Sequence, residues 1–190
     1  MRFALRHYLV AVAIAAFATS CGPPWKVIKA SGPPSALEGK TDVGVAFDYS
    51  ELVVDGKPLS QWMELKTKED PKYPETWANL MGKFETGVMS TFSSGFAGAH
   101  LATQSPGAAQ VIVSVKTFQM GKYIVIGQIP TVMNVHIQGK VGEAVTDEIM
   151  ITRSFPASVV QPSVFNHVPH VGEQVGNVAA QFMNAAQPKK

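Results

Sequence analysis

The sequence is poor in cysteine and in charge. It holds one cysteine in 190 residues, so the chain cannot form an internal disulfide. Charged residues make up 16% of it, with 16 Lys and Arg against 14 Asp and Glu. Nucleic-acid binders normally carry a basic excess or stripe, so we expect no nucleic-acid partner. A surface with little charge is often one that contacts another molecule.

Patterns for catalysis or metal binding are also scarce. His167 and His170 are the best metal candidates, but Pro169 lies between them and no further ligand is near, whereas a zinc site needs three or four. Ser93 and Ser94 lack the strand-turn-helix setting of a nucleophile elbow, and no glycine-rich phosphate loop is present. We therefore expect no enzyme, metal or cofactor. A hydrolase with an unassigned site stays as an alternative.

What the sequence does have is an apolar run near its start. The run extends from Leu9 to Cys21, follows Arg2 and Arg6, and ends in small residues. A basic start before about a dozen apolar residues is the layout of an export signal, too short to span a bilayer as a mature helix. We expect residues 1–20 to be removed. Without Arg2 and Arg6, 14 basic residues face 14 acidic ones, so the mature chain is close to neutral.

The end of this run, Ala18-Thr19-Ser20-Cys21, resembles the lipobox of bacterial lipoproteins. In that family the cysteine sulfur receives diacylglycerol, the preceding peptide bond is cut, and the new amino terminus is acylated, typically with palmitate. The resemblance implies lipid attachment at Cys21 and cleavage after Ser20. Ala18 departs from the usual leucine, and the alternative is an ordinary cleavage site at Ala18 with a chance cysteine nearby.

The residue after the cysteine bears on the location. In lipoproteins of two-membrane bacteria an aspartate there tends to retain the protein at the inner membrane, so Gly22 implies the periplasmic face of the outer membrane. In a cell with a single membrane the same resemblance implies a cell-membrane lipoprotein. In both cases the bilayer is a partner, through acylated Cys21.

Residues 21–41 are predicted to be a lipidated, proline-rich tether. Two Gly-Pro-Pro triplets favour extended backbone, and few positions have side chains suited to packing. Trp25 lies just past the anchor, where its ring would rest at the headgroup level or pack on the domain. We expect one globular domain over residues 42–187 and a polar tail over 188–190.

The domain is predicted to be an α+β two-layer sandwich, with two helices against a largely antiparallel sheet in the order β-α-β-β-β-α. Alternating apolar residues predict the strands, and spacings of three and four predict the helices. Asp55-Gly56 suits a tight turn, and the piece 123–129 could extend either neighbouring strand. The expected strands are 43–49, 111–116, 131–138 and 145–154; the expected helices are 74–97 and 171–183; loops or connections are expected at 66–74 and 155–169.

The helix over residues 74–97 carries two stripes. Large side chains such as Phe84 form one, and a stripe of small residues lies beside it, consisting of Gly87, Thr91, Ser94 and Gly98. Both stripes could be buried within the domain, since aromatic stripes at helical spacing usually belong to a core. Alternatively, the small residues form a face for a second copy or an envelope protein, because no charge lies between Glu85 and His100.

Three functional hypotheses follow. The first is a membrane-anchored, periplasm-facing lipoprotein that acts as a non-catalytic binding or assembly module, through an envelope partner or self-association. The second is a carrier that holds an apolar ligand in a cavity between helix 74–97 and the sheet, lined by the many phenylalanines and methionines. The third is the hydrolase, which would need polar side chains that converge in a cleft.

Overall fold

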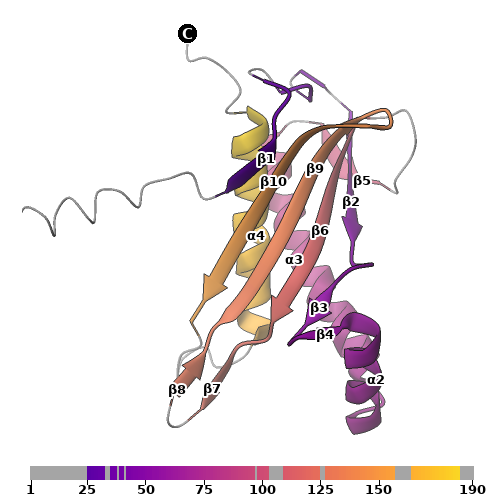
Figure 1. The fold of residues 1–190 in the computed structure, drawn as a ribbon, viewed down its shortest axis with the longest axis vertical. Helices are drawn as coiled ribbons and strands as arrows, with labels where there is room; N and C mark the ends of the chain where they lie inside the picture. Colours follow the sequence, from indigo (N-terminus) through magenta and orange to yellow (C-terminus); the bar gives the residue numbers. More distant parts are fainter. Residues whose placement is uncertain are drawn as a thin grey trace, which may run out of the picture.

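The computed structural model describes residues 25–32, 35–37, 39–40, 42–96, 98–102, 109–124, 127–156 and 164–184 (Figure 1). These residues form three helices and a sheet, with a small separate ribbon of two strands. The strands are β1 (Lys26–Lys29), β2 (Val43–Asp48), β3 (Val53–Val54), β4 (Lys57–Pro58), β5 (Ala99–Leu101), β6 (Ala109–Gln119), β7 (Lys122–Ile124), β8 (Gly127–Ile129), β9 (Thr131–Val141) and β10 (Ala144–Phe155). The helices are α2 (Leu59–Glu69), α3 (Tyr73–Gly95) and α4 (Val164–Asn184).

The sheet confirms the predicted α+β sandwich. Its strand order is β1-β10-β9-β6-β2-β5, and the long strands β6, β9 and β10 pair antiparallel, as β1 does with β10. β2 runs parallel to both β5 and β6. The two long helices α3 and α4 lie behind the sheet, on one of its faces, so the other face has no helix over it (Figure 1). None of the helices in the described ranges is both long and apolar enough to cross a bilayer.

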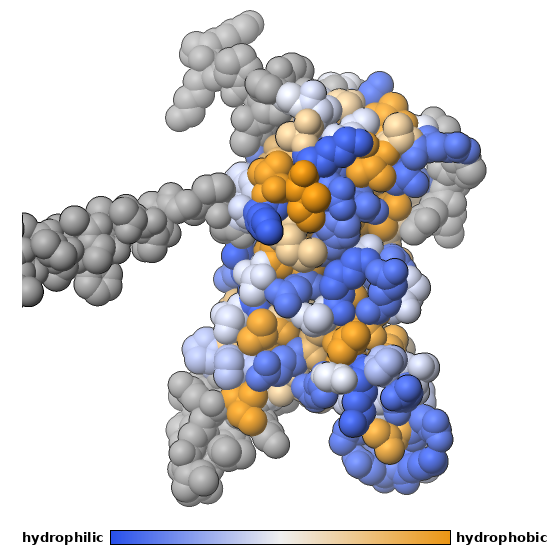
Figure 2. Space-filling view, viewed as in Figure 1, coloured by the Kyte–Doolittle hydropathy of each residue, from blue (hydrophilic) through white to orange (hydrophobic). Residues whose placement is uncertain are grey.

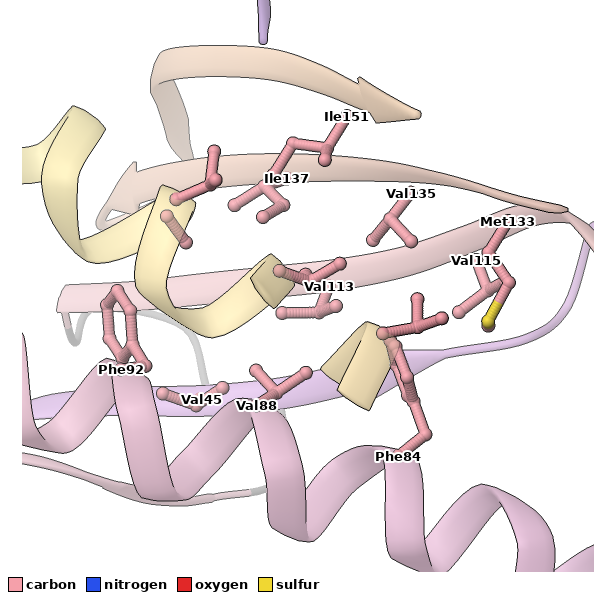
Figure 3. Close-up of a cluster of buried hydrophobic side chains, with 14 of the residues drawn as sticks. Val45, Phe84, Val88, Phe92, Val113, Val115, Met133, Val135, Ile137 and Ile151 are labelled. Atoms are coloured by element: carbon pink, nitrogen blue, oxygen red, sulfur yellow. The ribbon is translucent and has the colours of Figure 1, made fainter. Parts of the chain in front are cut away.

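The core lies between the sheet and these two helices. Along β9, side chains from Thr131 to Gly139 alternate between buried and half-buried, as expected of a strand with one face on a core. Figure 3 shows Met133, Val135 and Ile137 on this buried row, facing the helical layer. Phe84, Val88 and Phe92 of α3 meet them from the other side and are 0–1% exposed.

The two long helices contact each other at glycines of α4. A Cβ atom at Gly176 would lie 2.2 Å from the carbonyl oxygen of Val88, and one at Gly172 would lie 2.3 Å from that of Phe84. Both distances are far below van der Waals contact, so the backbones meet directly at these points. The large α3 side chains point to the sheet. Because Gly172 and Gly176 of α4 have no side chain, the two helices come into direct contact.

The segment after β2 differs from the prediction. The Asp55-Gly56 turn is confirmed, with φ values of 46° and 80° that suit a tight hairpin between β3 and β4. The expected loop from Lys66 is wrong in its first part, because α2 extends from Leu59 to Glu69. Trp62 anchors this helix: it is 4% exposed, and its ring centroid lies 5.2 Å from that of Trp77 on α3.

Two other boundaries also move. The expected connection over 155–169 ends earlier than predicted, because α4 begins at Val164 and holds Pro169 inside it. A proline near the start of a helix removes one backbone hydrogen bond, which the packing of the rest of α4 outweighs here. The piece 123–129 extends neither neighbour: β7 and β8 form their own ribbon, separated from β9 by Pro130.

Candidate functional site

No described helix covers the sheet face opposite α3 and α4 (Figure 1). Because successive side chains of a strand point to opposite faces, Gln110, Ile112 and Ser114 of β6 lie on it, while Val113 and Val115 face the core. The three are 4–6% exposed because β6 is a central strand and its neighbours' side chains shield them. Figure 2 shows apolar and polar side chains intermixed over this side of the molecule. We call this surface the open face.

Hydrogen bonds between strands tie the polar side chains of the open face together. The Asn134 amide donates to Thr117 Oγ1 at 2.6 Å and accepts from Thr152 Oγ1 at 2.6 Å, which links β6, β9 and β10. His136 Nε2 lies 2.5 Å from Glu148 Oε1 between β9 and β10. The hydrogen bonds of Asn134 satisfy uncharged polar side chains, so this part of the face is a preordered, uncharged surface for contact.

At the β2 end of the open face, Asp48 accepts a hydrogen bond from Ser114 Oγ at 3.1 Å. Its pKa lies below the ordinary value, chiefly because the backbone N–H of Ser50 donates to it, while partial burial opposes the shift. The carboxylate is therefore ionised at neutral pH and already paired. It orders the loop after β2 and has no free base to offer for catalysis.

A second candidate region is the N-terminal segment, residues 25–37, which packs on the edge of the sheet. β1 pairs with β10, and the Trp25 ring lies 6.1 Å, centroid to centroid, from Phe182 near the end of α4. Leu37 is fully buried, in the space above Gly139, where an added Cβ would lie 3.0 Å from Leu37 Cδ1. Apolar side chains of the expected tether therefore pack with the core, and Trp25 is the first described residue to do so.

Asp147 fastens this segment to the sheet. It continues the buried row of Ile149 and Ile151 on β10, yet it is a carboxylate, 1% exposed. Ser31 donates to Oδ1 through its backbone N–H at 2.9 Å and through its hydroxyl at 2.8 Å. Ser35 donates to Oδ2 at 2.9 Å, and the neighbouring Thr146 donates to the same oxygen at 2.9 Å. We call Asp147 with Ser31 and Ser35 the clasp.

The clasp holds a charged group where an apolar one would be expected. Burial acts to raise the pKa of Asp147, but the donors from Ser31, Ser35 and Thr146 together bring that pKa below its ordinary value. A buried carboxylate is tolerable only when hydrogen bonds replace its hydration. Both oxygens of Asp147 already accept hydrogen bonds, so its role is to hold the N-terminal segment on the sheet. The adjacent Glu148 points to the open face.

The predicted small-residue face divides into two parts. A Cβ at Gly87 would lie 2.5 Å from the carbonyl oxygen of Pro169, and Thr91 Oγ1 donates to the carbonyl of Glu173 at 2.8 Å, so α4 covers both positions. Ser94 and Gly98 are exposed, and the Ser94 hydroxyl is bonded to the carbonyl of Ser90 one turn earlier. A partner at Ser94 and Gly98 stays a prediction.

The histidine pair is brought onto one helix but into different surroundings. His167 is 1% exposed, and its Nδ1 lies 3.0 Å from Thr131 Oγ1. His170 is exposed and pairs with Glu173 at 3.1 Å. In the described part of the chain, no three His, Cys, Asp or Glu side chains lie close enough to share a metal ion.

A cavity of about 930 Å³ lies where the β3–β4 turn, α2 and the end of β6 meet. Trp62, Phe118 and Tyr73 form apolar parts of its wall, and Asp55 and Lys66 contribute charges. Asp55 accepts the backbone N–H of Met120 at 2.9 Å, and Lys66 pairs with Glu69 at 2.6 Å. Burial, followed by the charges of Asp55 and Glu69, raises the pKa of Tyr73, so its hydroxyl stays protonated at neutral pH. Among the described lining residues, these pairings leave no nucleophile beside a general base.

The space expected for an apolar ligand is filled at the positions that the structure describes. Phe84 and Phe92 of α3 lie against the sheet with Val45 and Val113 opposite, and all four are 0–1% exposed (Figure 3). The rings of Phe92 and Phe96 also stack at 5.4 Å. These phenylalanines therefore act as packing residues.

Cys21, Ser20 and Gly22, on which the predicted lipid attachment depends, lie outside the described residues, as does the predicted tail at 188–190. Sequence reasoning did not find the clasp. The only available signal was a carboxylate in register with buried residues of a strand, and its partners lie 112 and 116 residues earlier in the chain.

Comparison with known proteins gives a distant likeness in structure. No family model matches this chain, and no curated protein matches it in sequence. Among solved structures it is similar to a PelC dodecamer from Paraburkholderia phytofirmans, with a TM-score of 0.45 and 14% identity over 87% of this chain and 99% of that one. A single-substitution variant of that dodecamer gives a TM-score of 0.43 and 16% identity over the same shares. Both likenesses concern the course of the backbone alone.

Proposed function

We propose that this protein is a bacterial envelope lipoprotein, anchored through acylated Cys21, that acts without catalysis as a binding or assembly module. The supporting observation is that a packed side chain lies close to Cys21 in the chain. Only Gly22, Pro23 and Pro24 separate Cys21 from Trp25, whose ring packs on Phe182. A lipid on Cys21 would thus hold the body against the membrane. Gly22 favours the outer membrane, on its periplasmic face.

The open face is the surface that we propose for the protein partner. Its side chains are ordered by cross-strand hydrogen bonds, it carries little net charge, and α3 and α4 leave it free. Preordered side chains lose little conformational entropy when a partner binds, which favours association. The partner is either another envelope protein or a second copy of this chain.

The anchor is tested by expressing the full chain in a two-membrane bacterium with labelled palmitate. We expect label on the wild type, and a mature amino-terminal peptide that begins at Cys21 with the mass of a triacylated cysteine. The Cys21→Ser variant should lose the label and leave the membrane fraction. Gly22→Asp is the matched control for sorting: it should keep the label and move to the inner membrane. Unlabelled wild type with the same distribution as Cys21→Ser would refute the proposal.

The partner surface is tested with an added charge. Ser154 is exposed on the open face and takes no part in the hydrogen bonds of Asn134, so Ser154→Arg should weaken co-purification or self-association by at least tenfold and leave thermal stability within the range of an ordinary surface substitution. Asn79→Arg, on an exposed position of α3, is the matched control. Equal behaviour of the two variants would show that contacts are made elsewhere.

A further inference from the structure

We propose that the β1 edge of the sheet is a lipid-contact surface that lies on the headgroup layer of the bilayer. The surface consists of Lys26, Val27, Ile28 and Lys29, all exposed. The proposal rests on the lipid anchor at Cys21. It adds the orientation of the body, because an anchor alone leaves open which side of the protein meets the membrane.

Chain length brings this edge to the membrane. Four residue steps, from Cys21 to Trp25, span at most about 14 Å even when fully extended. Trp25 has no freedom to leave the body, since its ring packs on Phe182 and the next residue begins the pairing of β1 with β10. An acylated Cys21 therefore holds β1 within about 14 Å of the bilayer, which is about two headgroup layers, on the left side of the body in Figure 1.

The side chains of this edge suit a lipid surface. Val27 and Ile28 are 47% and 51% exposed, and they are adjacent. Among the described residues, the other exposed large hydrophobic ones, Leu65 and Leu101, lie far from β1 in the chain. Lys26 and Lys29 flank them. Apolar side chains between two lysines match an interface at which phosphate groups lie above the acyl boundary, and each lysine near an anionic surface favours binding about fivefold.

Protein partners fit the same edge less well. Val27 pairs with Ile149 and Lys29 with Glu148, so Ile28 is an extra residue that forms a bulge. A bulge and flanking lysines on an outermost strand hinder the addition of another strand. A lipid surface needs no such register. Because the outer edge of β1 has backbone groups without a described strand partner, contact is limited to the hydrated headgroup level.

The test places a spin label on the bilayer side. Acylation occupies the only native thiol, so an Ile28→Cys variant has one free thiol when the anchor is intact. The acylated variant is labelled and reconstituted into vesicles of phosphatidylethanolamine and phosphatidylglycerol. We expect its collision rate with membrane-dissolved oxygen to exceed that with a water-soluble nickel chelate. Leu65→Cys is the matched control, because Leu65 is similarly exposed, at 45%, on α2 at the opposite end of the molecule, and there the chelate should dominate.

Charge gives a second variant for the same experiment. Lys26→Gln in the Ile28→Cys background should lower the ratio of docked to undocked molecules about fivefold. Vesicles of phosphatidylcholine alone should lower this ratio to a similar extent. Lys68→Gln, on the exposed side of α2, should change nothing.

The outcomes separate this proposal from the anchor itself. Two labels per molecule would show that Cys21 carries no lipid, and the proposed function would fail with the inference. One label per membrane-bound molecule, with Ile28→Cys as accessible to the nickel chelate as Leu65→Cys, would overturn the lipid contact alone. A label at Ile28→Cys that is shielded from both reagents would also overturn it, because protein would then cover β1.

Discussion

The seam between α3 and α4 and the seam between the N-terminal segment and β10 hold the molecule together by opposite means. At the first, Gly172 and Gly176 let two backbones meet, and nothing titratable is needed. At the second, the buried carboxylate of Asp147 accepts hydrogen bonds from Ser31 and Ser35. The helix seam depends on shape and on the hydrogen bond from Thr91 to the carbonyl of Glu173, neither of which titrates. The clasp depends on the ionised carboxylate of Asp147, so acid can open it while the core stays intact.

The largest expected effect comes from filling the helix seam. In Gly176→Ala the new methyl group would lie 2.2 Å from the carbonyl oxygen of Val88, so the helices must separate. We expect a loss of about 3 kcal/mol in the free energy of unfolding, at the upper end for overpacked sites. Denaturant unfolding of the purified protein measures it.

Gly82→Ala is the control for that substitution. Gly82 is also in a helix, but nothing lies within 4 Å of an added Cβ. Alanine is the better helix former, so this variant should gain up to about 1 kcal/mol. Equal losses in the two variants would contradict the account of the seam.

The next effect comes from removing the carboxylate of the clasp. Asp147→Ala deletes the acceptor for Ser31, Ser35 and Thr146 and leaves their donors without it, which should cost about 2 kcal/mol. Hydrogen exchange should locate the loss in residues 25–37, with little change in β6 and β9. A uniform rise in exchange over the sheet would show instead that Asp147 supports the whole core.

These two regions also differ in how far sequence reasoning reaches. The alternating row of β9 and the aromatic stripe of α3 follow from local periodicity, because each pattern repeats within one element. The Asp55-Gly56 turn is likewise local. The contacts of Leu37 and Asp147 are not local. Leu37 is a single leucine among prolines, and Asp147 is a carboxylate on a strand. The role of each follows only from residues that lie far away in the chain.

The α2 helix shows another limit. Its apolar residues are few, Leu59, Trp62 and Met63 among them, and most of the helix is polar. It is stabilised chiefly by the contact of Trp62 with Trp77 and Tyr73, which lie on the next helix. Pro169 caused the opposite error, because a helical residue was predicted to lie in a connection. Proline usually ends a helix, but here the packing of α4 offsets the one lost hydrogen bond.

A smaller effect should follow from acid. The pKa of Asp147 is lowered in the folded protein, so its contribution to stability is complete above the ordinary value of 3.8 and fades as the pH falls from there through the folded pKa. Asp147→Asn cannot titrate. The stability gap between wild type and this variant should therefore be constant near neutral pH and shrink below about pH 4. A stability difference between wild type and Asp147→Asn that widens in acid would contradict this prediction.

The smallest expected effect is the loss of a single donor. Ser35→Ala removes the hydrogen bond to Asp147 Oδ2 and the acceptor of the Leu37 amide, while Thr146 still donates to Oδ2, so we expect a loss of about 1 kcal/mol. Ser154→Ala is a control for hydroxyl removal at an exposed site and should change stability by less than about 0.5 kcal/mol. Thermal unfolding of both variants measures the difference.

The central claim is that residues 25–37 are part of the folded body and not a loose tether. Native-state hydrogen exchange of the Ser31 and Leu37 amides tests it most directly, because the first donates to Asp147 Oδ1 and the second to Ser35 Oγ. We predict that both amides exchange at least a hundredfold more slowly than unstructured peptide at neutral pH, and that Asp147→Ala removes the protection at Ser31. Exchange of both amides at the unstructured rate in the wild type would contradict the claim.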